Sequence, residues 1–291
     1  NAVRSENEFR AYYKIPLYKL YGADGKTEIP LYANLNKAIR TKREPEVLQE
    51  QGKKALAAGF SVVKCTPFDE ITTCNGDNDF GPAYGRIEAL LQVIPIEQVA
   101  LDCHQRFTGY TLGRMVEHIT KRYGIPYWIE DPVETSDLIT MKCMRQKYPF
   151  VRWAAGEDAF TIQQMMNVVN SGCYDVIMPD IKYIGGPSTV QALLPVAEEC
   201  GKKATLHNPD GIIGTAHSAH ASAILENGLP MEYPFDAVKD REELCLQKEC
   251  VKNGRYVLND EPGIGVSISE QALKEYGQRF FENHWEDYHG E

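Results

Sequence analysis

The sequence is short of the features that mark several classes of protein. Its 291 residues hold no apolar run near the ~20 residues of a membrane helix and no charged-then-apolar leader pattern, so we expect neither. Acidic residues outnumber basic residues by 41 to 31, and the formal charge is −10. Nucleic acids and anionic membranes would repel such a chain, so no nucleic acid and no membrane is expected as its main partner.

Paired cysteines are also lacking. The eight cysteines are scattered along the chain, and no two of them form a CxxC motif. A thiol-based zinc or redox site is therefore not indicated. Scattered thiols in a chain of this size are typical of reduced packing residues, which favours a cytoplasmic protein.

What the sequence does contain is one alternation that runs through most of its length. Short apolar or β-branched segments alternate with longer amphipathic segments, and Gly or Pro often lies between them. The apolar segments predict strands at residues 29–36, 61–66, 99–104, 127–131, 151–157, 175–180, 203–207 and 231–234. The amphipathic segments predict helices at residues 44–58, 84–93, 112–123, 137–147, 161–170, 189–200 and 214–225.

This alternation favours a TIM-like (β/α)7β-type barrel, because each strand is followed by a crossover helix of suitable length. An open doubly wound sheet is the alternative. It usually has fewer strands and often a glycine-rich first turn, which we do not find. Residues 72–82, rich in Asn, Asp and Gly, predict a long loop on the barrel face where active sites lie.

Ionisable residues stand at or near the ends of seven successive predicted strands. In a barrel the carboxyl ends of the strands converge on one mouth, so these side chains are expected to lie together. They are Lys64, Asp102, His104, Glu130, Glu157, Asp180, His207 and Glu232.

Three of these residues are carboxylates on consecutive strands. Asp102, Glu130 and Glu157 are each about one β/α unit apart, which predicts that they lie side by side. Converging carboxylates repel one another unless a cation lies among them, and oxygen ligands favour Mg²⁺ over zinc. The alternative is that each of them caps a following helix or pairs with a surface cation.

His207 and Asp180 end neighbouring predicted strands. A carboxylate beside an imidazole orients the ring and raises its basicity, so the pair is a candidate general base. A structural histidine is the alternative. Lys182, two residues beyond Asp180, is a weaker candidate for a second base.

Three further residues carry open alternatives. His104 points to the same side of its strand as Asp102 and is a candidate general acid, or else a helix cap or a solvated side chain. Lys64 is a candidate for binding a substrate carboxylate or enolate oxygen, or else a lysine whose ammonium group extends to solvent. Glu232 could donate a hydrogen bond if burial raises its pKa.

In order and spacing, these motifs resemble the mandelate racemase subgroup of the enolase superfamily, and within it the galactonate dehydratase-like acid-sugar dehydratases. The resemblance covers residues 13 to 275. The matching segments are Leu101-Asp102-Cys103-His104, Trp128-Ile129-Glu130-Asp131-Pro132, Ala155-Gly156-Glu157, Met178-Pro179-Asp180-Ile181-Lys182, Leu206-His207-Asn208-Pro209 and Glu261-Pro262-Gly263-Ile264-Gly265.

The resemblance implies a role for each candidate residue. Asp102, Glu130 and Glu157 would bind Mg²⁺. His207, with Asp180, would take the proton α to a carboxylate. His104 would protonate the departing β-hydroxyl group, while Glu232 would hydrogen-bond the enediolate. A homo-oligomer is common in the family and is expected here.

The sequence departs from the family pattern in two places. Many relatives carry a Lys-x-Lys pair on the second strand, whereas this chain has Lys64-Cys65-Thr66, which favours a one-base elimination. The family also has an N-terminal α+β capping domain, which is expected to be missing or truncated. The expected organisation is therefore an N-terminal remnant at 1–22, the barrel at 23–240 and a C-terminal extension at 241–291.

These inferences predict a Mg²⁺-dependent dehydratase that converts an aldonic or aldaric acid, a small-molecule substrate, to a 2-keto-3-deoxy acid. An epimerase, racemase or cycloisomerase that uses the same metal and His207 is one alternative. A non-catalytic sugar-acid binding protein that retains the barrel site is the other.

Overall fold

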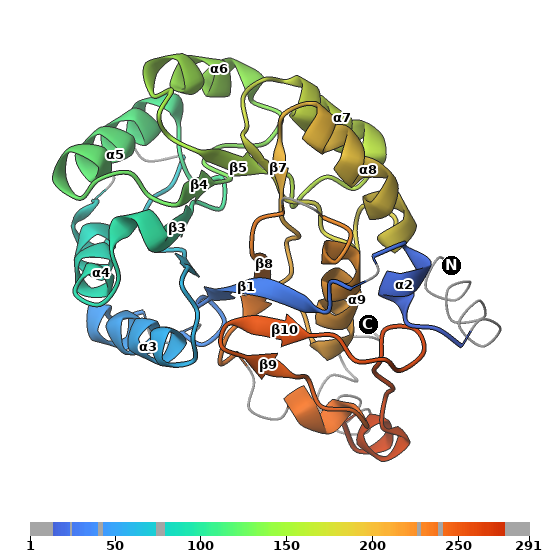
Figure 1. The fold of residues 1–291 in the computed structure, drawn as a ribbon. Helices are drawn as coiled ribbons and strands as arrows, with labels where there is room; N and C mark the ends of the chain where they lie inside the picture. Colours follow the sequence, from blue (N-terminus) through green and yellow to red (C-terminus); the bar gives the residue numbers. More distant parts are fainter. Residues whose placement is uncertain are drawn as a thin grey trace, which may run out of the picture.

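The computed structural model describes residues 14–23, 25–39, 43–73, 79–225, 228–237 and 241–276 (Figure 1). Predictions that fall on residues 1–13, 74–78 or 277–291 lie outside the described residues, including the centre of the 72–82 loop. Within the described part of the chain, no helix is long and apolar enough to cross a membrane.

The predicted barrel is confirmed, with parallel strands in the centre and helices outside (Figure 1). Its strands are β1 (Glu28–Asn34), β2 (Val63–Cys65), β3 (Val99–Asp102), β4 (Trp128–Glu130), β5 (Trp153–Ala155), β6 (Val176–Ile177), β7 (Lys203–Ala204) and β8 (Met231–Pro234). β1 pairs in parallel with both β2 and β8, and the ladder continues from β2 to β7 in chain order.

Individual hydrogen bonds, rather than a strand ladder, join β7 to β8. We find no ladder between these two strands among the described residues. Instead, the backbone N–H of Leu229 donates to the carbonyl of Ala204 at 3.1 Å. The hydroxyl of Thr205 donates to the carbonyl of Pro230 at 2.7 Å. The two strands therefore lie side by side, and the barrel mouth is complete around its circumference.

Each predicted helix is present. The helices between the strands are α3 (Pro45–Ala57), α4 (Gly81–Leu91), α5 (Gly109–Arg122), α6 (Leu138–Lys147), α7 (Ile162–Asn170), α8 (Pro187–Glu199) and α9 (Ile212–Ser222). The starts of α4 and α5 and the end of α9 each differ from prediction by three residues. Helix α4 begins at Gly81 rather than at residue 84, and Pro82 lies in its first turn, where a proline needs no hydrogen-bond donor.

Helix capping explains where two of the helices begin, and alternating side-chain directions explain how the strands pack. The side chains of Thr108 and Thr161 form capping boxes at the starts of α5 and α7, which satisfy backbone donors that the helices leave free. Along β3, Ala100 points into the barrel interior with Trp128 and Met178, whereas Leu101 packs outward against the helices. Two apolar layers follow from this period of two, one inside the barrel and one outside it.

The C-terminal segment, which could not be placed from the sequence, returns to the barrel. Strand β10 (Arg255–Val257) pairs antiparallel with β1 and with β9 (Val251–Lys252). Gly254 joins β9 to β10 with φ +66°, and a Cβ atom there would lie 2.4 Å from the carbonyl oxygen of Gly59. The division at residues 22 and 240 stays a prediction, although this hairpin contacts the barrel directly.

The short N-terminal helix α2 (Leu17–Leu20) also packs on the barrel. The backbone N–H of Tyr18 donates to Nδ1 of His220 on α9 at 3.0 Å, and the two rings stack. The backbone N–H of Leu17 donates to the carbonyl of Gly263 at 2.7 Å. His220 therefore has a structural role, as does the Gly263 turn.

Candidate active site

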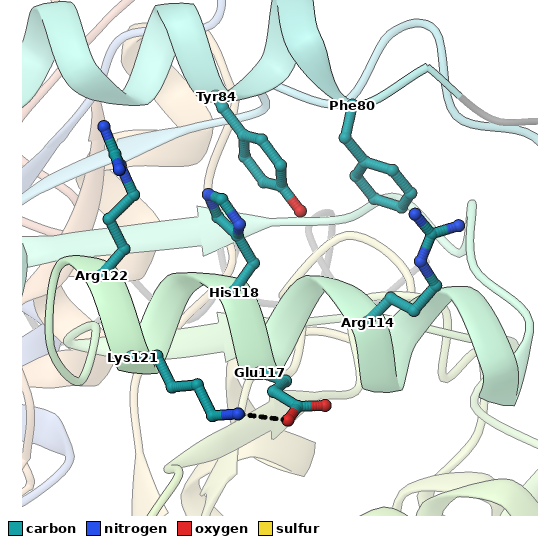
Figure 2. A pocket seen from close by; sticks show the side chains of 7 residues that line it. All are labelled: Phe80, Tyr84, Arg114, Glu117, His118, Lys121 and Arg122. Atoms are coloured by element: carbon teal, nitrogen blue, oxygen red, sulfur yellow. Dashed lines mark hydrogen bonds and ion pairs between the residues drawn. The ribbon is translucent and has the colours of Figure 1, made fainter.

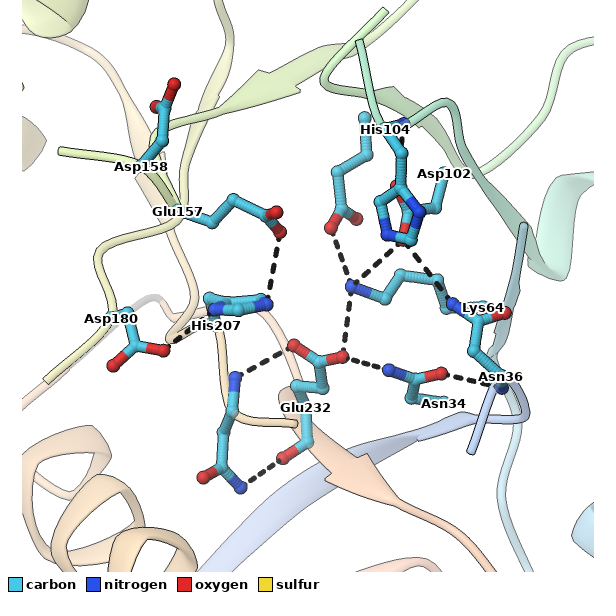
Figure 3. A network of polar contacts seen from close by, with 12 residues as sticks. Asn34, Asn36, Lys64, Asp102, His104, Glu157, Asp158, Asp180, His207 and Glu232 are labelled. Atoms are coloured by element: carbon cyan, nitrogen blue, oxygen red, sulfur yellow. Dashed lines mark hydrogen bonds and ion pairs between the residues drawn. The ribbon is translucent and has the colours of Figure 1, made fainter. Parts of the chain in front are cut away.

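The parallel register brings the candidate residues to one end of the barrel (Figure 3). Asp102 on β3 lies opposite Glu130 on β4, and Asp180 forms a bridge with His207 just beyond β6 and β7. Glu232 lies on β8 beside Tyr32 of β1. The predicted convergence on one mouth follows from this register, because equivalent strand ends lie at the same level.

Lys64 lies at the centre of the group. Its Nζ atom is 2.6 Å from Glu130, 3.0 Å from Glu232 and 3.8 Å from Asp102. The side chain is only 1% exposed, which rules out a lysine that extends to solvent. Burial alone would lower the pKa of Lys64, but the carboxylates of Glu130 and Glu232 raise it well above the usual range. The ammonium group therefore stays charged.

Asp102 is held by residues that follow three strands, β1, β2 and β3. Its Oδ2 atom lies 3.0 Å from Nε2 of His104 and accepts hydrogen bonds from Thr66 at 3.2 Å and Asn36 at 3.4 Å. Burial would raise the pKa of Asp102, but Lys64 and His104 lower it to about 2. Thr66, at the place of the family's second lysine, therefore helps to orient this carboxylate. The sequence indicated only that Thr66 could not be a base.

An acidic cluster adjoins Lys64. Ligand atoms of Glu130, Asp131 and Glu157 all lie within 4.8 Å of one another. Burial raises the pKa of Glu130 to about 8 against the opposing effect of Lys64, and it raises the pKa of Glu157 as well. Two of the three predicted metal ligands, Glu130 and Glu157, belong to this cluster, whereas Asp102 is not part of it and lies opposite Glu130 on the neighbouring strand, 3.8 Å from Nζ of Lys64.

Asp131 was not among the sequence candidates. It is 1% exposed, its φ is +38°, and neither carboxylate oxygen has a hydrogen-bond partner among the described residues. Burial, followed by repulsion from Glu157 and Glu130, raises its pKa well above the usual range. The only signal in the sequence is its place between the strand-ending Glu130 and Pro132.

His207 and Asp180 form the predicted pair. Nδ1 of His207 lies 2.9 Å from Oδ2 of Asp180, and Nε2 lies 3.1 Å from Oε2 of Glu157. Burial lowers the pKa of His207, but Glu232, the hydrogen bond to Asp180 and Glu157 together raise it to about 9. One ring nitrogen is therefore fixed, and the other faces the acidic cluster.

Lys182 lies behind this pair rather than in the cluster. Its Nζ atom is 2.5 Å from Asp210 and 3.5 Å from Asp180. Burial lowers the pKa of Lys182, but the hydrogen bond to Asp210 and the charge of Asp180 raise it overall. An ammonium group stabilised in this way is poorly suited to take a proton from a substrate.

His104 faces the cluster from a different direction than His207 (Figure 3). Its side chain is 43% exposed, and its φ of +46° is followed by +57° at Gln105. The backbone N–H of Gln105 donates to the carbonyl of Asp131 at 2.7 Å, which holds this turn. The hydrogen bond to Asp102 raises the pKa of His104 although burial opposes it. Two adjacent left-handed residues thus place the imidazole over Asp102.

Glu232 could donate a hydrogen bond only if burial raised its pKa, and this condition is not met. Burial does raise it, but Lys64 and His207 lower it further, so that the pKa lies below its usual value. The carboxylate accepts hydrogen bonds from the side chain of Asn34 at 2.5 Å and from the backbone of Asn208 at 2.8 Å. Glu232 is therefore an acceptor here, because all its neighbours are donors.

A separate groove of about 640 Å³ lies between α4 and α5 on the outside of the barrel (Figure 2). Tyr84 and His118 stack there with ring centroids 3.9 Å apart. Burial and Arg122 lower the pKa of His118, so this ring stays neutral. None of the predicted site residues lines the groove, and we assign it no part in the chemistry.

Comparison with known proteins agrees with this geometry. The family model described as "Enolase C-terminal domain-like" matches residues 47–272, and the chain belongs to this family. The chain is 24% identical over 272 residues to a D-xylonate dehydratase of Haloferax volcanii, covering 89% of this chain and 64% of that protein. It is also 24% identical to a D-gluconate dehydratase of Thermoproteus tenax, covering 90% of this chain and 52% of the relative. The chain thus spans about half to two thirds of the length of these relatives.

Solved structures share the fold. A putative dehydratase from Zymomonas mobilis superposes with a TM-score of 0.82 at 20% identity, covering 91% of this chain and 71% of that one. A mandelate racemase/muconate lactonizing enzyme-like protein from Rubrobacter xylanophilus gives a TM-score of 0.79 at 21% identity, covering 91% and 72%. The fold and the family are therefore established.

Proposed function

We propose that this chain is the catalytic barrel of a Mg²⁺-dependent acid-sugar dehydratase. The observation that carries the proposal is the pair of histidines at one acidic cluster. His207 is oriented by Asp180 and His104 by Asp102, and the two rings face the cluster from different directions (Figure 3). One base and one acid in such an arrangement suit the removal of a proton and of a hydroxyl group from adjacent carbons.

The buried carboxylates fit a divalent cation. Glu130 has a pKa of about 8, and both oxygens of Asp131 are buried without hydrogen-bond partners in the described residues. Carboxylate oxygens are the ligands that Mg²⁺ prefers. We therefore propose that Asp102, Glu130 and Glu157 hold Mg²⁺, with Asp131 adjoining them. When bound, the ion supplies positive charge against the negative charge that develops on the substrate carboxylate.

His207 is the proposed base. Its Nε2 atom takes the proton from the carbon α to the carboxylate, while Nδ1 remains hydrogen-bonded to Asp180. The ring must be neutral to accept this proton. Glu232 and Glu157 stabilise its charged form, so compensation of their charge lowers the pKa of His207 toward neutrality. Lys64 keeps its ammonium group beside the same carboxylates and adds fixed positive charge.

His104 is the proposed acid. Breaking the C–O bond at the β-carbon releases a hydroxyl group, and a proton from His104 converts it to water. The hydrogen bond to Asp102 favours the protonated ring before this step. The resulting enol rearranges to a 2-keto-3-deoxy acid. Thr66, which directly follows β2, holds Asp102 and offers no second base, which supports elimination over a two-base racemisation.

The test is a screen of aldonic and aldaric acids with Mg²⁺, measuring 2-keto acid by semicarbazide and deuterium exchange at the α-carbon. We expect one acid to give a keto acid, and His207→Asn and Glu157→Gln to abolish its formation. His118→Asn and Glu46→Gln, far from the cluster, are the matched controls and should leave the rate unchanged. Exchange without keto acid would indicate an epimerase or racemase, and neither signal despite bound Mg²⁺ would indicate a binding protein.

A further inference from the structure

Asp131 is a buried carboxylate at the barrel mouth to which the mechanism above gives no task. It directly follows Glu130, the last residue of β4, and it is 1% exposed. Neither of its carboxylate oxygens has a hydrogen-bond partner among the described residues. A buried polar group without a partner is costly, and a buried charge costs more, unless a ligand or an ion compensates it.

The other fully buried acids at the mouth differ from Asp131 in this respect. Each of them accepts a hydrogen bond from a donor of the protein, and they are Asp102, Glu130, Asp180 and Glu232. Glu130, for example, accepts hydrogen bonds from Lys64 at 2.6 Å and from the indole N–H of Trp128 at 2.8 Å. Asp131 is therefore the buried acid of the mouth whose oxygens remain available to a ligand.

The charges around Asp131 make a cation the expected ligand. The strongest charges that act on it are all negative and belong to Glu157, Glu130, Asp102 and Asp158. Lys64 is the buried cation of the cluster, but the described residues show no ion pair between it and Asp131. A neutral or anionic ligand would leave the repulsion among these carboxylates in place, whereas a cation would relieve it.

One ion can reach Asp131 and two neighbouring acids at once. Carboxylate oxygens of Glu130, Asp131 and Glu157 all lie within 4.8 Å of one another. Mg²⁺ and Ca²⁺ bind oxygen at about 2.0–2.6 Å, so two ligands on opposite sides of one ion lie about 4–5 Å apart. The three carboxylates therefore have the spacing of ligands around a single divalent cation.

Asp102 is less available to an ion than Asp131. Its Oδ2 atom lies 3.0 Å from Nε2 of His104 and accepts a hydrogen bond from Thr66 at 3.2 Å. Its Oδ1 atom accepts a hydrogen bond from the backbone N–H of His104 at 3.3 Å. An ion that binds Asp102 competes with these donors, whereas an ion that binds Asp131 displaces no hydrogen bond of the described residues.

The backbone holds Asp131 in an unusual conformation. Its φ is +38°, in the left-handed region that Asp and Asn adopt more readily than most other residues with a side chain. Its N–H donates to the carbonyl of Ala154 on β5 at 3.0 Å, and its carbonyl accepts from the N–H of Gln105 at 2.7 Å. Contacts on both sides therefore fix this conformation, as is expected where a ligand group is positioned in advance.

We propose that Asp131 is a direct ligand of the divalent cation, which it binds together with Glu130 and Glu157. The inference rests on the proposed function for the presence of the ion, and it adds a fourth carboxylate to that site. Asp131 takes no proton and touches no reacting carbon. Its contribution is to the affinity for the ion.

The first experiment measures Mn²⁺ binding without any sugar acid, from the EPR signal of the free ion. We expect Asp131→Asn to raise the Kd for Mn²⁺ about 100-fold, as Glu157→Gln does, because even a group that only supports a ligand contributes about 10–100-fold. Asp158→Asn is the matched control, since its carboxylate accepts hydrogen bonds from Gln105 and Thr135 and points away from the cluster (Figure 3). A Kd for Asp131→Asn equal to that of the control would overturn the proposal.

A second measurement separates a direct ligand from a nearby charge. Eu³⁺ also prefers oxygen ligands, and its luminescence lifetimes in H₂O and D₂O count the water molecules bound to it. Asp131→Gly tolerates the same φ and removes the carboxylate, so we expect about one more water on the ion than in wild type. An unchanged water count would show that Asp131 acts only through its charge, and the proposal would be wrong.

The melting temperature of the metal-free protein tests for a structural role. Asp131→Asn should leave it unchanged or raise it, because the substitution removes a charge from among buried carboxylates. A large decrease would indicate a carboxylate that holds the fold together, and this too would overturn the proposal.

The same measurements distinguish this inference from the proposed function. If Mn²⁺ binding depends on Asp131 but no sugar acid yields a keto acid, the ligand assignment stands and the dehydratase assignment fails. If wild type binds Mn²⁺ and Asp131→Asn binds it equally well, the ligand assignment fails and the dehydratase assignment is untouched. If wild type binds no Mn²⁺, both fail.

Discussion

Replacing Lys64 with methionine removes a buried cation from among three buried carboxylates. Nζ of Lys64 lies 2.6 Å from Glu130 and 3.0 Å from Glu232, and both acids are 0% exposed. Methionine fills similar volume but leaves the acids without this partner. Breaking a buried ion pair from one side typically costs about 3–5 kcal/mol in the free energy of unfolding. We expect a loss of this size in the metal-free Lys64→Met protein.

Two conditions should reduce that loss. The proposed Mg²⁺ would supply another cation beside Glu130 and Asp102, so the difference between variant and wild type should shrink when the ion is added. Protonation of the uncompensated acids has a similar effect. Their pKa values in the folded variant lie above the unfolded values, so the destabilisation should grow as the pH rises and fall as the pH drops.

The assay is urea denaturation of wild type and variant, with and without Mg²⁺, at several pH values. Lys121→Met is the control, because this lysine pairs with Glu117 on an exposed helix surface and its side chain is 74% exposed. It should change the unfolding free energy little. A Lys64→Met loss no larger than that of the control would refute the reasoning, as would a loss that Mg²⁺ and low pH leave unchanged.

Four further outcomes are expected. The pKa of His207, about 9 in the metal-free protein, should appear in histidine NMR and fall when Mg²⁺ binds. Because this pKa is raised above 6.5, His207 should stabilise the folded protein fully below about pH 6.5 and lose that contribution as the pH rises through 9. Denaturation curves of His207→Asn should lack this pH dependence. Asp180→Asn should lower kcat about 10²–10⁴-fold at nearly unchanged KM, since the ring loses its orientation; an unchanged kcat would contradict the assignment. Gly254→Ala should lower the melting temperature, because φ is +66° and a Cβ would meet Gly59, whereas exposed Gly211→Ala should not.

Much of the barrel could be predicted because its signals are local. Alternating burial along strands and amphipathic spacing along helices depend on neighbours within a few residues. The ends of strands and helices are predicted least accurately, because these local signals fade there. Strand β7 covers only Lys203–Ala204, while the predicted strand extended to His207, which joins Asp180 through an isolated bridge. Backbone hydrogen bonds from Thr205 to Ile177 and from His207 to Pro179 continue the pairing beyond the assigned strand.

The sequence predicted which residues converge at the barrel mouth, but it predicted their pKa shifts less well. Each predicted residue lies at the mouth, because the β/α period places successive strand ends together. Asp131 was missed, since nothing in its local sequence separates a buried carboxylate from a solvated one after a strand. The pKa direction of Glu232 was also missed, because it depends on Lys64 and His207, which are distant in sequence.

The sequence by itself determined the barrel, the order of ionisable residues around its mouth and the replacement of a second base by Thr66. Those features follow from periodicity and from the identity of single residues. Only the tertiary structure decided that Lys64 joins Glu130 to Glu232, that β10 pairs with β1, and that Asp158 joins Gln105 to Thr135. Such contacts join residues far apart along the chain, and burial then sets their charge.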